Sequence, residues 1–144
     1  MLMPNSRTAL YLAYSCVTTV SRDDWLSAFV IVRRSKDLRE WSDYSIVSQG
    51  GICGNGAVSA ESPFVVQRGT WFYLFRSSST DFNTYVYRSD TPFHFGSNDD
   101  SKLISILPIK APEIIEHGGQ WYISELDDFR GIKMSRLSWV DDAP

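Results

Sequence analysis

Glu61 stands in a setting that suits acid–base chemistry. It follows Ala60 directly, lies two residues before Pro63, and precedes an apolar run that begins at Phe64. General acid catalysis needs a carboxyl group that keeps its proton near neutral pH, and apolar neighbours favour the protonated state. Pro63 also biases Ser62 towards an extended backbone, which predicts that a strand begins at this point. The segment around Glu61 is therefore the first candidate for a functional site.

Two further polar residues lie at the ends of apolar runs, as Glu61 does. Glu113 follows Pro112 and heads a second apolar run, so it is a candidate either for contact with a substrate hydroxyl or for a structural salt bridge. Arg76 ends the aromatic run 71–75, where it would either pair with a carboxylate or lie on the surface. Both residues are candidates for binding a substrate.

The remaining reactive side chains predict no metal site and no cofactor. His94 and His117 lie in turn-like segments with no second ligand nearby in the sequence. Cys16 and Cys53 lack metal-ligand spacing and are expected to be free thiols. The glycine-rich segment 50–56 matches no phosphate-binding or dinucleotide-binding pattern, and a mobile loop leading to Glu61 is the expectation there.

The elements that would position these residues repeat along the chain. Pro63 and Pro112 are 49 residues apart, Trp71 and Trp121 are 50 apart, and each pair belongs to an X-Pro step followed by two apolar strands. A second repeated element carries a serine in a turn, at positions 35, 89 and 135. A period near 50 residues with about four strands per unit is typical of a β-propeller blade.

The fold class follows from this period and from the strand alternation. The aromatic content of 14% and the apolar–polar alternation favour strands, and no segment keeps a helical period. We therefore predict an all-β fold of about three blades, each a four-stranded antiparallel sheet. Residues 1–144 would form a single incomplete propeller domain with blades at roughly 1–50, 51–100 and 101–144. The recurring tryptophans are expected to pack between blades, whereas Trp25 is a candidate for stacking on a sugar at the surface.

The charge distribution excludes several partner classes. The formal net charge is −3, and the lysines and arginines are scattered, so the sequence has no basic footprint for nucleic acid. No apolar run approaches the roughly 20 residues that a membrane-spanning helix needs. A propeller with an open ring exposes sheet edges, so we expect the chain to self-associate through them.

Several of these segments resemble a known enzyme family. Ala60-Glu61-Ser62-Pro63 is similar to the Glu-x-Pro element of the five-bladed β-propeller glycoside hydrolases of families 43, 32 and 68. The segment 35–41 resembles their Ser-x-Asp-Leu-x-x-Trp blade turn, and 131–139 resembles the last strand of their propeller. The resemblance implies that Glu61 is the general acid and that the substrate is a carbohydrate containing arabinose, xylose or fructose.

The same resemblance implies two further aspartates, one acting as base or nucleophile and one holding the sugar ring. No segment of this sequence matches their motifs, and both would precede residue 1. Glycoside hydrolysis needs two carboxyl groups, so the chain by itself is expected to be inactive. A fragment of a glycosidase is therefore the first hypothesis, and a non-catalytic carbohydrate-binding or interaction propeller module is the alternative.

Overall fold

The computed structural model describes residues 2–3, 10–20 and 26–140 of the chain. All regular elements among these residues are strands, as the sequence predicts. The strands are β1 (Leu2–Met3), β2 (Leu10–Val20), β3 (Leu26–Ser35), β4 (Ser45–Gln49), β5 (Glu61–Arg68), β6 (Trp71–Ser78), β7 (Asn83–Ser89), β8 (Leu103–Leu107), β9 (Ile114–His117), β10 (Gln120–Asp127) and β11 (Gly131–Leu137). A search of these residues for a helix long and apolar enough to cross a membrane finds none.

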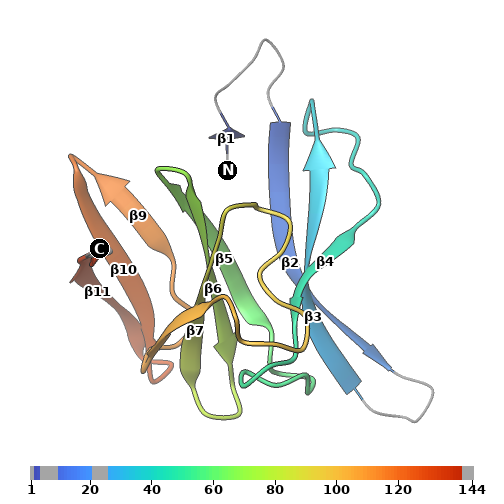
Figure 1. The fold of residues 1–144 in the computed structure, drawn as a ribbon. Coiled ribbons are helices and arrows are strands. Elements are labelled where there is room, and N and C mark those ends of the chain that lie inside the picture. The colour runs from blue at the N-terminus through green and yellow to red at the C-terminus, as the bar shows by residue number, and fades with distance from the viewer. Residues whose placement is uncertain (1, 4–9, 21–25, 141–144) are drawn as a thin grey trace.

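The strands form three antiparallel sheets in which neighbours in sequence are neighbours in space. The first sheet has the order β1-β2-β3-β4, the second β5-β6-β7-β8, and the third β9-β10-β11. Figure 1 shows the three sheets side by side, each turned relative to the next like adjacent blades. The predicted fold class, an all-β partial propeller of about three blades, is confirmed.

Two details of the blades differ from the sequence-based prediction. The third sheet has three strands among the described residues, where four were expected. The second sheet ends with β8 at Leu107, so it extends past the boundary that we placed at residue 100. The reason for the second difference is the long β7–β8 connection, which adds residues between the third and fourth strands of that blade.

β6 shows why the second sheet is the centre of this structure. Its side chains alternate between two cores: Phe72 and Leu74 pack towards the first sheet, whereas Tyr73 and Phe75 pack towards the third. All four side chains are buried. Burying a large apolar side chain contributes about 1.5–3 kcal/mol, so this strand stabilises both inter-sheet contacts at once. Its nearly continuous apolar sequence is what a strand covered on both faces requires.

The two X-Pro steps of the repeat have matching backbone geometry. Ser62 before Pro63 has a φ of 45°, and Ala111 before Pro112 has a φ of 47°. The expectation of an extended Ser62 was therefore wrong. A register shift between Glu61 and Phe64 accompanies the left-handed residue, so a bulge starts β5 in place of a regular extended step.

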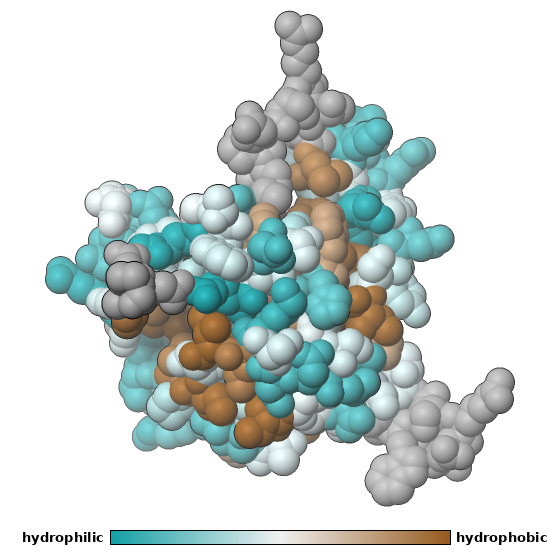
Figure 2. Space-filling model, viewed as in Figure 1, coloured by the Kyte–Doolittle hydropathy of each residue, from teal (hydrophilic) through white to brown (hydrophobic). Residues whose placement is uncertain are grey.

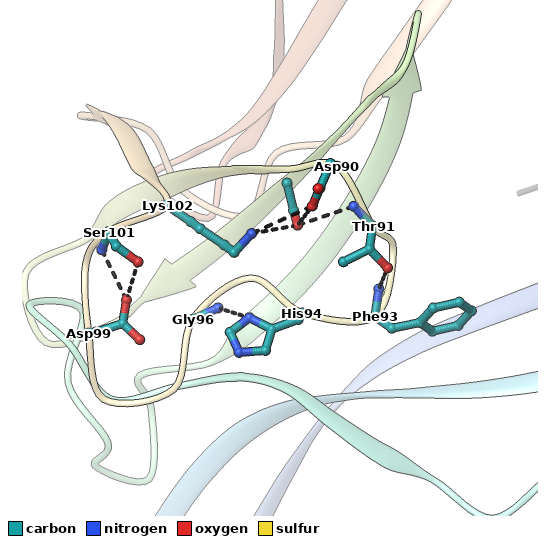
Figure 3. A network of polar contacts seen from close by, with 9 residues as sticks. Asp90, Thr91, Phe93, His94, Gly96, Asp99, Ser101 and Lys102 are labelled. Carbon is teal, nitrogen blue, oxygen red and sulfur yellow. Dashed lines mark hydrogen bonds and ion pairs between the residues drawn. The ribbon is translucent and has the colours of Figure 1, made fainter.

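The repeated serines shape the turns that follow the third strand of the first two blades. Ser35 is buried, and its hydroxyl accepts a hydrogen bond from the backbone N–H of Leu38 at 2.8 Å. Ser89 is also buried, and its hydroxyl accepts bonds from the Thr91 N–H at 3.3 Å and from the Lys102 ammonium at 2.9 Å. Figure 3 shows this second network, which fixes the β7–β8 connection.

The tryptophans of the repeat differ in their surroundings. Trp139 lies between the second and third sheets, with ring centroids 4.6 Å from Tyr73 and 5.5 Å from Trp121. Trp71 is 38% exposed and stacks under the Arg88 guanidinium at 4.6 Å, within its own sheet. The prediction that the recurring tryptophans pack between blades is therefore correct for Trp121 and Trp139. Trp25 lies outside the described residues.

The edge strand β8 of the second sheet exposes apolar side chains. β8 has Ile104 at 48% exposure and Ile106 at 43%. Figure 2 shows hydrophobic side chains gathered in the lower part of the molecule, in the region where Figure 1 places β8. An exposed apolar strand at a sheet edge favours association with another chain.

Candidate functional site

Glu61 is the first residue of β5, and its backbone pairs with Ser77 of β6. The preceding Ser59 and Ala60 are buried, so the chain enters the strand from the interior. The Glu61 side chain is half-buried, and its Oε2 accepts a hydrogen bond from the Ser79 hydroxyl, in the turn directly after β6. The carboxylate is therefore held in place by the neighbouring β6–β7 turn.

Glu61 faces a pocket of about 490 Å³ that residues from all three sheets line. Cys16 comes from the first sheet, and the serines of the β6 end come from the second. Leu126 and Phe129 come from the third sheet, where β10 turns into β11. Its volume falls in the range of about 300–1,000 Å³ that is usual for small-molecule sites.

Arg76 is fully buried, so the idea that it lies on the surface is wrong. Its Nε donates to the carbonyl oxygen of Ser59 at 2.7 Å, and its Nη1 donates to the carbonyl oxygen of Gly50 and to the Ser48 hydroxyl, both at 3.2 Å. Its Nη2 donates to the carbonyl oxygen of Gly54. The guanidinium group thus lies under the segment that leads to Glu61.

The glycine-rich segment 50–56 is therefore tied down, contrary to the mobile loop that the sequence suggested. Besides Arg76, the Asp100 carboxylate accepts the Ile52 N–H at 3.0 Å, and the Ala28 N–H donates to the Asn55 carbonyl at 3.1 Å. Gly50 has a φ of 61°, and a Cβ there would lie 3.1 Å from the backbone Cα of Asn98 as well as 2.1 Å from its Oδ1, so this close approach favours glycine. Glycine serves packing here.

Glu113 lies just before β9 and is exposed. Its backbone N–H donates to the Ser124 hydroxyl at 2.9 Å, and its carbonyl accepts the Ser124 N–H at 2.9 Å. Its side chain lines a separate hollow of about 290 Å³ on the third sheet. That hollow shares Ala111 and Leu126 with the Glu61 pocket, so the two glutamates line neighbouring depressions.

The described residues contain no group of three or more histidines, cysteines, aspartates or glutamates that could hold a metal ion. His94 lies in the β7–β8 connection, where its Nδ1 accepts the Gly96 N–H at 3.2 Å (Figure 3). Cys53 is buried and its thiol donates to the Ser59 carbonyl, whereas Cys16 is exposed at the pocket. Burial raises the pKa of the Cys53 thiol to about 11.

The pocket residues that the sequence analysis did not find include Lys110, Phe82 and Phe129. Phe82 and Phe129 each follow an aspartate, 47 residues apart, so the repeat itself held a signal for them. Lys110 stands directly before the second X-Pro step, at the position that Glu61 has before the first. Spacing alone did not reveal that all of these side chains meet.

The sequence matches no known family profile, and no curated protein matches it either. Among solved structures, the chain is similar to an alpha-L-arabinofuranosidase of glycoside hydrolase family 43 from Clostridium thermocellum, with a TM-score of 0.57 and 12% identity. The match covers 96% of this chain and 52% of that enzyme, so this chain spans about half of the enzyme's length. At such identity the likeness shows the fold: three blades of a β-propeller like that of a family 43 glycoside hydrolase.

Proposed function

We propose that this chain is the acid-bearing part of a glycoside hydrolase that cleaves arabinose-, xylose- or fructose-containing sugars. Glu61 is the general acid in this proposal. The supporting observation is its location: it heads the first strand of the middle blade and faces a pocket lined by all three sheets. The fold is shared with an arabinofuranosidase, which favours a glycoside as the ligand of this pocket.

In this proposal, Glu61 protonates the oxygen of the leaving sugar. The Ser79 hydroxyl binds one carboxylate oxygen, which fixes the rotamer and leaves the other oxygen for the substrate. Glycosidic cleavage also needs a second carboxyl group to activate water or to attack the anomeric carbon. Glu61 is the only carboxylate among the described residues that line the pocket. The base in our proposal is therefore none of the described residues that line this pocket.

The other two candidates take supporting roles in this proposal. Glu113 lines the neighbouring hollow and would contact a hydroxyl of a sugar bound further along the substrate. Arg76 was a candidate for binding substrate, but its burial and its bonds to Gly50, Gly54 and Ser59 favour positioning the segment that carries Glu61.

A non-catalytic carbohydrate-binding module is the second candidate function. The observation that favours it is the single carboxylate of the pocket, because one acid without a base can bind a sugar but cannot complete hydrolysis. The two functions differ in what Glu61 does. In a binding module its replacement changes affinity alone, whereas in a glycosidase it changes the rate in a way that depends on the leaving group.

The experiment is Glu61→Gln in a protein that joins residues 1–144 to blades carrying the base. The variant should lose about 10²–10⁴-fold in kcat on natural glycosides, because general acid catalysis typically accelerates a reaction by a factor of that size. It should lose far less on dinitrophenyl glycosides, whose leaving group departs without a proton. Glu40→Gln, on an exposed turn of the first sheet, is the matched control. Equal losses on good and poor leaving groups would remove Glu61 from the acid role.

A further inference from the structure

Two hairpin turns of neighbouring blades carry the same dipeptide in the same unusual geometry. Asp81-Phe82 lies between β6 and β7, and Asp128-Phe129 lies between β10 and β11. Phe82 has a φ of 58° and Phe129 a φ of 59°. A bulky residue rarely adopts this left-handed conformation, which costs of order 1–2 kcal/mol. Neither ring offsets that cost by burial, because Phe82 is 49% and Phe129 81% exposed.

One lysine connects the two turns. The Lys110 ammonium lies 4.6 Å from the centroid of the Phe82 ring and donates a hydrogen bond to Asp128 Oδ1 at 3.0 Å. The backbone carbonyl of Lys110 accepts the Leu126 N–H at 3.0 Å, so the lysine is anchored to the third sheet. The hydrogen bond from Lys110 lowers the pKa of the Asp128 carboxyl, which keeps that partner charged. The two phenylalanine turns are thereby held together at one end of the sheets.

Both rings line the pocket that Glu61 faces. The same pocket is also lined by the hydroxyl-bearing residues Ser62 and 77–79, of which Ser79 donates to Glu61. The charge of Lys110 is offset by Asp128, so the lysine gives the pocket no strong preference for an anionic ligand. Flat apolar faces beside hydroxyls and one carboxylate match a neutral ring that has C–H faces and a rim of hydroxyls.

We infer that Phe82 and Phe129 form an aromatic subsite that binds one sugar ring at the entrance of the Glu61 pocket. This inference rests on the proposed function for its ligand class, but not on the acid role of Glu61. The strained backbone holds the rings out of the two sheets, where a sugar can stack on them, and strain of this kind persists where structure serves a function. Lys110 is a positioning residue that fixes the distance between the two turns.

The test is binding of arabinotriose, xylotriose and kestose to the 144-residue chain labelled with 4-fluorophenylalanine. Fluorine spectra report each ring separately, and the Phe82→Leu and Phe129→Leu variants assign the two resonances. At least one of these sugars should shift both resonances. Each variant should weaken binding by about threefold to tenfold, the value of one aromatic contact. Leucine is a fair replacement, because Leu38 in this chain already has a φ of 64°.

Tyr44→Leu is the matched control, since this aromatic residue is 50% exposed just before β4 and lies outside the pocket. It should leave the affinity unchanged. The inference is overturned if no sugar shifts the two resonances up to high millimolar concentration, or if Tyr44→Leu weakens binding as much as the phenylalanine variants do. Shifts that depend on protein concentration alone would assign the rings to self-association and also overturn it. A Glu61→Gln chain that still binds, with no leaving-group effect in the rate assay, would refute the acid role and support the subsite.

Discussion

Arg76→Met is expected to destabilise the chain more than the replacement of any other arginine we have described. The guanidinium group is buried and donates to the carbonyls of Gly50, Gly54 and Ser59 and to the Ser48 hydroxyl. Methionine fills much of the same volume but donates nothing. Three carbonyl oxygens in the segment before Glu61 then lose a charged donor; those of Gly50 and Ser59 belong to buried residues, and that of Gly54 to a half-buried one.

The size of the effect follows from those bonds. A hydrogen bond to a charged group contributes about 1.5–3 kcal/mol, and an unsatisfied buried acceptor costs about 1–3 kcal/mol. Relaxation of the glycine-rich segment and the entry of water recover part of this, so we expect a loss of about 4 kcal/mol. With a urea m-value of about 1.5 kcal/mol/M, the midpoint should fall by roughly 2–3 M.

The assay is urea unfolding followed by the fluorescence of the five tryptophans. Arg39→Met is the control, because Arg39 is exposed and exposed charges contribute about 0–1 kcal/mol. Arg76→Lys keeps the charge but not the planar fork of donors, so it should lie between the two and remain folded if the methionine variant does not. An Arg76→Met midpoint within the error of the Arg39→Met midpoint would refute the role that we assign to this side chain.

The remaining predictions concern the thiols, the sheet edge and activity. Cys16 should react with Ellman's reagent at pH 8 in the folded chain, whereas Cys53, with its pKa raised by burial to about 11, should react only on unfolding; equal rates would contradict this. Ile104→Lys with Ile106→Lys should lower the self-association seen by analytical ultracentrifugation, and an unchanged distribution would exclude the β8 edge. The 144-residue chain should not hydrolyse aryl arabinofuranosides above a Glu61→Ala background, and clear turnover would reveal a base within residues 1–144.

The fold could be predicted because its signal is distributed over the whole chain. The distances Pro63–Pro112 and Trp71–Trp121 give the blade length, and the aromatic run of β6 predicts a strand. The structure then shows that this strand serves two cores, which a single strand sequence cannot reveal. The conformation of Ser62 was missed for a local reason: the usual effect of a following proline is outweighed here by a bulge at the start of β5.

Arg76 and the segment 50–56 were misread because each was interpreted alone. A glycine-rich stretch between strands suggests mobility, and an arginine at a strand end suggests the surface. In the structure the two explain each other, since the guanidinium needs acceptors and the glycine segment offers carbonyls that face inward. Contacts between residues 17–28 positions apart decide this arrangement, and a local sequence pattern does not contain them.

Glu61 and Lys110 occupy equivalent positions of the repeat but have different neighbours. Both residues directly precede a left-handed residue and a proline, so the same backbone geometry presents a carboxylate in one blade and an ammonium in the next. Both side chains line one pocket. Lys110 is engaged by Asp128 and Phe82, whereas the partner of Glu61 is a neutral hydroxyl. A carboxylate held by a neutral donor keeps one oxygen available to a ligand, but an ammonium fixed by an anion and a ring is suited to hold structure. The repeat thus supplies the position, and the neighbours of each side chain decide which copy could carry the chemistry.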